Sequence, residues 1–168
     1  MNSEVSSSAR RAPRPNARAR HWALALSLAP GLALSPRRRA LLRDMRAFCR
    51  ALPRALAAPL PQAMQSITPA ALAPADPDLI RNLADLAALL ERRSTLGLCL
   101  RRSLTRYFFL RRAGLPVAVQ FGARFVGGRP DRDITGHAWL TLHDVPYHES
   151  GEDWQGFAIL YSYPPTEA

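Results

Sequence analysis

The hydrophobic pattern divides the chain into a helical first half and a strand-forming second half. Apolar residues recur at every third or fourth position over residues 36–58 and again over 79–90, which predicts two amphipathic helices. Between them, residues 59–78 contain five prolines and predict a loop or linker. A third helix is predicted from a cap at Ser94 or Thr95 through Arg112.

After this third helix the period of the pattern changes from that of helices to that of strands. Residues 117–121 and 134–142 alternate apolar and polar side chains, as half-buried strands do. Glycine and proline at 127–131 predict a turn between them, and a tight connection at 143–144 leads into a third strand at 145–149. Helices followed by an antiparallel sheet predict an α+β fold in one domain.

The N-terminal segment has a different composition. Residues 1–20 are rich in serine, arginine and proline and are expected to form a disordered arm. The basic residues followed by the apolar run 22–30 also resemble the start of a signal peptide, but Pro30 breaks the run and it is too short to span a membrane. We therefore expect a helical region at 21–90 with its proline-rich linker, and a functional core at 91–163.

Charge and cysteine content narrow the range of functions. The net charge is +10, and the first 60 residues hold 12 arginines against two acidic residues. All basic residues are arginine, as a GC-rich genome would favour, so the charge does not indicate a nucleic-acid partner. Two cysteines, without the spacing of a disulfide framework or a zinc site, predict no metal and no cofactor. A working thiol suits the reducing cytoplasm.

Cys99 is placed where a cysteine can act as a nucleophile. It lies within about one turn of the start of the predicted third helix, where unpaired N–H groups and the helix dipole favour a thiolate. The same N–H groups could stabilise the oxyanion of a tetrahedral intermediate. Cys49, by contrast, lies on the apolar face of the first helix and is expected to be a buried core residue.

His137 supplies a base for that thiol. On the strand 134–142, His137 and Trp139 share one face, while Ala138 and Leu140 share the other and suit the core. A histidine that meets the third helix from the sheet can take the thiol proton and later protonate the leaving amine.

A third group is needed to orient the imidazole. Glu149, on the strand after His137, is the favoured residue, because a hairpin would return it alongside the histidine. Asp144 in the turn and Asp153 further on are the alternatives. Two further histidines are expected at the surface, namely His143 and His148.

Three segments together resemble one protein family. They are CLRRSLTRYFFLRRAGLP at 99–116, VQFG at 119–122 and HAWL at 137–140. In order and spacing they closely resemble the lasso peptide biosynthesis B2 proteins, which are leader peptidases of the transglutaminase-like, papain-related superfamily. The resemblance is strong over residues 90–150.

The resemblance implies roles and partners. It implies that Cys99 is the nucleophile, that His137 is the base, and that the acid twelve positions after the histidine, Glu149, orients it. The family more often has aspartate there. It also implies removal of the leader from a ribosomally made precursor peptide, before an ATP-dependent cyclase closes the macrolactam ring. A separate leader-recognition (B1-type) protein is implied, because residues 21–90 show no β-ribbon pattern.

Two other functions fit the same residues. The triad could pass the acyl group to an amine, as transglutaminases and amide-forming relatives do. Alternatively, the chain could be a non-catalytic protein whose basic N-terminal half binds nucleic acid or an acidic partner.

Overall fold

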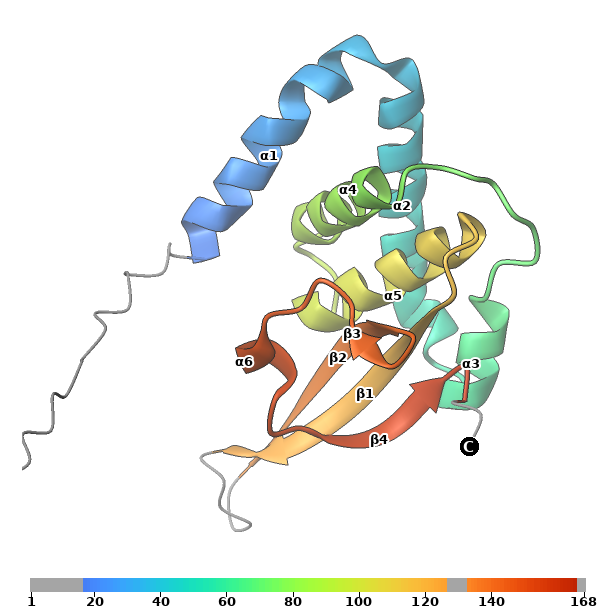
Figure 1. Cartoon of the computed structure of the whole chain (residues 1–168), viewed down its shortest axis with the longest axis vertical. Helices are drawn as coiled ribbons and strands as arrows, with labels where there is room; N and C mark the ends of the chain where they lie inside the picture. Colours follow the sequence, from blue (N-terminus) through green and yellow to red (C-terminus); the bar gives the residue numbers. More distant parts are fainter. Residues whose placement is uncertain (1–16, 127–132, 166–168) are drawn as a thin grey trace, which may run out of the picture.

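The fold is α+β, as the sequence predicts. A computed structural model describes residues 17–126 and 133–165, and in it five helices precede a four-stranded antiparallel sheet (Figure 1). Helices α2, α4 and α5 gather on one side of the sheet, with α5 against it. The helices are α1 (Ala17–Leu34), α2 (Pro36–Ala55), α3 (Leu60–Ser66), α4 (Pro77–Leu90), α5 (Leu98–Arg112) and, within the sheet region, the short α6 (Gly151–Trp154).

Capping residues explain where the predicted helices begin and end. At the start of α2, the Ser35 side chain accepts a hydrogen bond from the Arg38 backbone N–H at 3.3 Å, and Pro36 occupies the first turn. At the start of α4, the Asp76 carboxylate accepts one from the Asp78 N–H at 3.0 Å. Gly114 follows α5 with φ +93°, a conformation that favours glycine at a helix end.

The sheet has the order β3-β2-β1-β4. Strands β1 (Val117–Phe125) and β2 (Ile134–Leu142) pair antiparallel along their whole length, with Gly122 opposite His137. A tight turn at His143 and Asp144, both with positive φ, leads into the short β3 (Val145–Pro146). The outer strand β4 (Ala158–Tyr163) pairs with the other side of β1.

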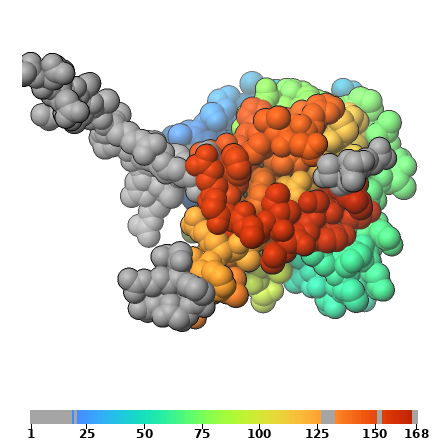
Figure 2. Space-filling view, turned by 60° about the horizontal axis from the view of Figure 1, so that its bottom comes forward, coloured from blue at the N-terminus to red at the C-terminus, as the bar shows by residue number. Residues whose placement is uncertain are grey.

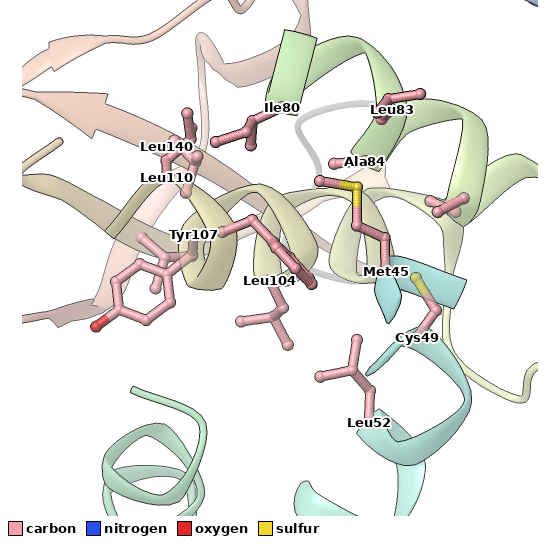
Figure 3. Packing of buried hydrophobic residues seen from close by; sticks show 14 of the residues in the cluster. Met45, Cys49, Leu52, Ile80, Leu83, Ala84, Leu104, Tyr107, Leu110 and Leu140 are labelled. Carbon is pink, nitrogen blue, oxygen red and sulfur yellow. The ribbon is translucent and has the colours of Figure 1, made fainter. Parts of the chain in front are cut away.

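Helix α5 lies at the centre of the hydrophobic core. Its buried side chains Leu104, Tyr107 and Leu110 pack between the other helices and the sheet (Figure 3). Met45 and Cys49 of α2 close the core from the helical side, together with residues of α4. The position of α5 relative to the sheet is therefore fixed by buried apolar contacts along most of its length.

Some boundaries differ from those predicted in the helical half. Residues 17–20, the end of the predicted disordered arm, form the first turn of α1, whereas the rest of that arm, 1–16, lies outside the described residues. The proline-rich segment is not wholly a loop, since Leu60–Ser66 forms α3, where Pro61 occupies a first-turn position that needs no N–H donor. Helix α5 begins at Leu98 with Gly97 as its cap, later than the cap at Ser94 or Thr95 predicts.

The sheet also departs from the prediction. The third strand is only two residues long, so Glu149 lies beyond its end rather than within it. Strand β4 has no counterpart in the sequence prediction. The predicted turn at 127–131 falls outside the described residues. None of the helices in the described part has the length and apolar character that crossing a membrane requires.

Candidate active site

Cys99 is the second residue of α5 and is partly exposed. Helix geometry leaves the first backbone N–H groups of α5 without acceptors inside the helix, and the positive end of the helix dipole lies there. The predicted environment of the thiol is thus present, three to four residues further along the chain than the predicted cap.

Two polar side chains of α5 hold this helix end in place. Arg101 is buried and donates to the backbone carbonyl of Ala88, at the end of α4, at 3.2 and 3.3 Å, and also to the carbonyl of Leu96. Ser103 donates its hydroxyl to the Ala138 carbonyl of β2 at 2.7 Å. The second bond ties α5 to the residue next to His137, so it fixes the helix against the strand that carries the base.

His137 lies in the middle of β2 and shares a cavity with Cys99. The cavity has a volume of about 310 Å³ and lies between the start of α5 and the paired strands β1 and β2. Three glycines contribute to its walls, namely Gly97, Gly122 and Gly136. The structure therefore places both Cys99 and His137 in the walls of one cavity.

Aromatic rings hold the imidazole. The ring centroid of His137 lies 5.9 Å from that of Trp139, with the planes 16° apart, and 5.3 Å from that of Phe157. The guanidinium group of Arg124 lies over the ring of Phe157, 4.3 Å from its centroid. A β-carbon on Gly122 would come within 2.8 Å of the Trp139 ring, so glycine is required opposite the histidine.

The electrostatics of His137 suit a general base. Burial, followed by the charge of Arg102, lowers the pKa of His137 below its ordinary value of 6.5, while Asp153 acts in the opposite direction. Its Nε2 atom is buried and has no hydrogen-bond partner among the described residues. A neutral imidazole with an unused ring nitrogen can accept a proton from a thiol.

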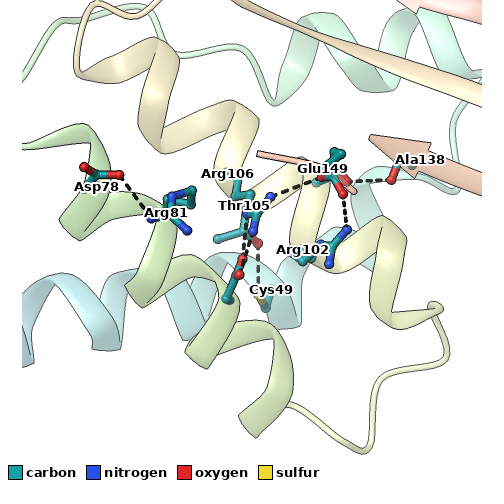
Figure 4. Close-up of polar contacts among 10 residues, drawn as sticks. Cys49, Asp78, Arg81, Arg102, Thr105, Arg106, Ala138 and Glu149 are labelled. Carbon is teal, nitrogen blue, oxygen red and sulfur yellow. Dashed lines mark hydrogen bonds and ion pairs between the residues drawn. The ribbon is translucent and has the colours of Figure 1, made fainter. Parts of the chain in front are cut away.

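Glu149 is placed close to α5 by two ion pairs (Figure 4). Its carboxylate accepts from Arg102 at 2.7 Å and from Arg106 at 3.1 Å, and only 1% of its side chain is exposed. Arg106 in turn binds both carboxylate oxygens of Asp85 on α4 at 2.6 Å. Burial, the largest influence, raises the pKa of Glu149, and the two arginines oppose it.

The two alternative acids, Asp144 and Asp153, lie in different surroundings. Asp144 is exposed in the turn between β2 and β3. Asp153 lies in α6, accepts from the Ser150 hydroxyl at 2.5 Å, and is the acid whose charge acts on His137. Burial raises the pKa of Asp153, but the bond from Ser150 and the charge of Arg102 outweigh it and lower that pKa. Among the described residues, no hydrogen bond joins His137 to Glu149.

The second cysteine lies in the core, where the sequence analysis places it. Cys49 is fully buried, and its sulfur lies 3.0 Å from the Thr105 hydroxyl of α5. Burial is the largest influence on this thiol and raises its pKa. Cys49 therefore lacks both the exposure and the charge environment that a nucleophile needs.

Several residues of the site have no counterpart in the sequence analysis. Arg102 and Arg106 are the clearest, because two arginines four positions apart on a helix face that is otherwise apolar are expected to have buried acidic partners. Asp85 binds Arg106 alone, and this pair could be predicted only once α4 is known to face α5. Phe157 and Arg124 reach the site through tertiary pairing of β4 with β1, which no local pattern reveals.

Comparison with known protein families supports the arrangement independently. The family model of the transglutaminase-like superfamily matches residues 40–162. This range contains Cys99, His137 and Glu149 and reaches back into α2. No curated protein and no solved structure shows a significant match to the chain.

Proposed function

The chain belongs to the transglutaminase-like superfamily, and from this premise we propose that it is a thiol-dependent peptidase with Cys99 as nucleophile and His137 as base. The superfamily is papain-related, and its type of activity is that of a cysteine protease or acyltransferase. The observation that carries the proposal is the cavity shared by Cys99, at the start of α5, and His137, in the middle of β2.

The geometry supports a two-step reaction. His137 takes the proton of Cys99, and the thiolate attacks the carbonyl carbon of the substrate, while the N–H groups at the start of α5 stabilise the oxyanion. The tetrahedral intermediate collapses, the C–N bond breaks, and the leaving amine takes the proton from His137. Water, deprotonated by His137, then cleaves the thioester and restores the thiol.

The acidic residues have separate roles in this proposal. Glu149 acts as a positioning residue, because its two ion pairs hold Arg102 and Arg106 of α5 against the segment that follows β3. Asp153 provides the negative charge that acts on the imidazole of His137. The orienting role, for which the sequence favours Glu149 with Asp144 and Asp153 as alternatives, is thereby divided between Glu149 and Asp153.

We further propose that the substrate is a ribosomally made precursor, and that cleavage removes its leader during lasso peptide maturation. The support is the resemblance of residues 99–116, 119–122 and 137–140 to the B2 leader peptidases. A separate leader-recognition protein would present the precursor, and an ATP-dependent cyclase would use the product.

The test is cleavage of candidate lasso precursor peptides, with and without a separate leader-recognition protein, followed by mass spectrometry. We expect Cys99→Ala to abolish cleavage and Cys49→Ser, which keeps a hydroxyl near Thr105, to retain it. Products that together contain one added water indicate hydrolysis, whereas incorporation of an added amine indicates acyl transfer. Equal activity of the two variants would refute a role for Cys99.

A further inference from the structure

A second and larger cavity adjoins the one that holds Cys99 and His137. It has a volume of about 970 Å³ and is lined by Ala123 and Thr135, whereas the smaller cavity is lined by Gly122 and Gly136. These residues are sequence neighbours on β1 and β2, and Ala123 is paired with Gly136. The two cavities therefore follow one another along the same pair of strands.

The walls of the larger cavity are mainly apolar. Four of the side chains that line it are large, hydrophobic and solvent-exposed, and such a cluster is unusual on a protein surface. They are Phe125, Val126, Ile134 and Leu160. Figure 2 looks onto this side of the molecule, where β4 runs in red beside the orange ends of β1 and β2. We refer to this cavity and these four residues as the apolar groove.

Strand β4 borders the groove through Ala158 and Leu160. It is the outer strand of the sheet, next to β1, and its first three residues, 158–160, are exposed. The outer edge of such a strand presents backbone N–H and C=O groups that an extended polypeptide can pair with. Apolar pockets beside a strand edge are the combination that binds an extended peptide with apolar side chains.

We propose that the apolar groove binds an extended, apolar segment of the polypeptide that Cys99 cleaves. This inference rests on the proposed function. The occupant follows from the continuity of the two cavities, because a polypeptide with its carbonyl at Cys99 continues directly along β1 and β2. The segment lies on the acyl side of the cleaved bond, since that part stays attached to Cys99 until water attacks.

The length of the segment follows from strand geometry. Ile134 lies two residues before Gly136 on β2, which corresponds to about 7 Å at about 3.3 Å per residue. An extended substrate advances by the same amount per residue. The groove therefore receives side chains about two to four positions from the carbonyl that Cys99 attacks.

The inference can be tested without the natural substrate. The probes are two peptidyl chloromethyl ketones, one with the apolar sequence Val-Leu-Val-Ala and one with the polar sequence Asp-Ser-Asp-Ala. In each case a bond forms between Sγ of Cys99 and the methylene carbon, chloride leaves, and the thiol proton passes to solvent through His137. Each labelling rate is divided by the rate with iodoacetamide, which is too small to occupy the groove.

The chain offers closely matched variants. Leu160 lines the groove and Leu72 lies in the loop before α4, and each is 72% exposed. Ile134 lines the groove and Val145 lies on β3, and each is 66% exposed. We expect Leu160→Asp and Ile134→Asp to reduce the normalised rate of the apolar reagent about tenfold. Leu72→Asp and Val145→Asp should leave it unchanged.

The outcomes separate failure of this inference from failure of the proposed function. If neither iodoacetamide nor the peptide reagents label Cys99 of the wild type, the proposed function fails. If iodoacetamide labels Cys99 but the wild type does not prefer the apolar reagent, or Leu160→Asp has no more effect than Leu72→Asp, the groove does not bind substrate. A wild-type dimer that Leu160→Asp converts to a monomer, measured by light scattering, would assign the groove to a second copy and also overturn the inference.

Discussion

The imidazole of His137 is held by two kinds of neighbour, aromatic rings and charges. Trp139 and Phe157 fix the plane of the ring, and burial lowers its pKa. Arg102 lowers that pKa further and Asp153 raises it. The neutral form that a base requires is thus favoured in His137 relative to an exposed histidine.

A titration of His137 tests this balance. Because the pKa lies below 6.5, the NMR signal of the imidazole should titrate with a midpoint below that value. Asp153→Asn removes the charge that raises the pKa, so the midpoint should move further down. The control is Asp144→Asn, since Asp144 is an exposed acid in the turn before β3. An upward shift in Asp153→Asn, or equal shifts in both variants, would contradict the role given to Asp153.

Phe157 gives a second prediction about the same ring. Phe157→Ala removes one side of the aromatic packing around His137 and the ring beneath Arg124. We expect kcat for precursor cleavage to fall by more than KM rises, because the ring orients the base rather than the substrate. Phe157→Tyr, which keeps the ring, should restore most of the loss. A change confined to KM would indicate that Phe157 contacts substrate instead.

The elements around the site are joined by buried ion pairs. The Glu149 carboxylate binds Arg102 and Arg106 of α5, and Arg106 binds Asp85 of α4. The side chains of Glu149 and Arg106 are 1% and 3% exposed, so removal of either leaves an uncompensated buried charge. The network connects α4, α5 and the segment after β3, and both of its arginines lie in the segment 99–116 on which the family resemblance depends.

Unfolding by urea measures the contribution of this network. Glu149→Ala should lower the free energy of unfolding by about 3 kcal/mol, because two arginines lose a buried partner. Glu91→Ala is the matched control: it removes an acid that also binds two arginines, Arg46 and Arg50, but these are substantially exposed. That variant should cost under about 1 kcal/mol. Similar losses in both variants would show that burial does not strengthen the Glu149 pairs.

The Ser103 hydroxyl forms a hydrogen bond that joins α5 to β2. Ser103→Ala leaves the buried Ala138 carbonyl without its donor, which should lower the free energy of unfolding by about 1–3 kcal/mol and also reduce kcat. Ser66→Ala is the control, because the Ser66 hydroxyl donates only to Ala63 in its own helix. If Ser103→Ala loses stability but keeps full activity, the bond does not position the site.

The sequence predicts elements wherever a local pattern is present. Helices α2 and α4 and strands β1 and β2 follow from the spacing of apolar residues, and the turn before β3 follows from two residues suited to positive φ. Strand β4 could not be predicted in this way, because its first four residues, 158–161, show no alternation of apolar and polar side chains and its partner β1 lies more than 30 residues earlier.

The same distinction applies to the residues of the candidate site: some lie in a recognisable local pattern and others do not. Cys99 and His137 could be predicted because each lies at a recognisable place in a predicted element. The partners of Glu149 could not, since an acidic residue in a loop gives no local sign of burial, and its arginines lie 43 and 47 positions away. Only the packing of α5 against the sheet brings these charges together.

In the whole molecule, the helical layer and the sheet each contribute one of the two reacting groups. The core around Leu104, Tyr107 and Leu110 fixes α5 on the sheet, and the start of α5 then meets the middle of β2. The second cysteine lies inside that core, hydrogen-bonded to the Thr105 hydroxyl of α5. One chain thus contains a partly exposed thiol at the site and a buried thiol that serves as an internal reference.

The central claim is that Cys99 and His137 act as a pair, and the alkylation rates of the two cysteines test it most directly. The folded protein is treated with iodoacetamide, and mass spectrometry follows each cysteine separately. We predict that Cys99 reacts faster than the buried Cys49 at neutral pH, and that His137→Ala lowers the Cys99 rate about tenfold while leaving the Cys49 rate unchanged. Equal rates for the two cysteines, or a Cys99 rate that His137→Ala leaves unchanged, would contradict the pair.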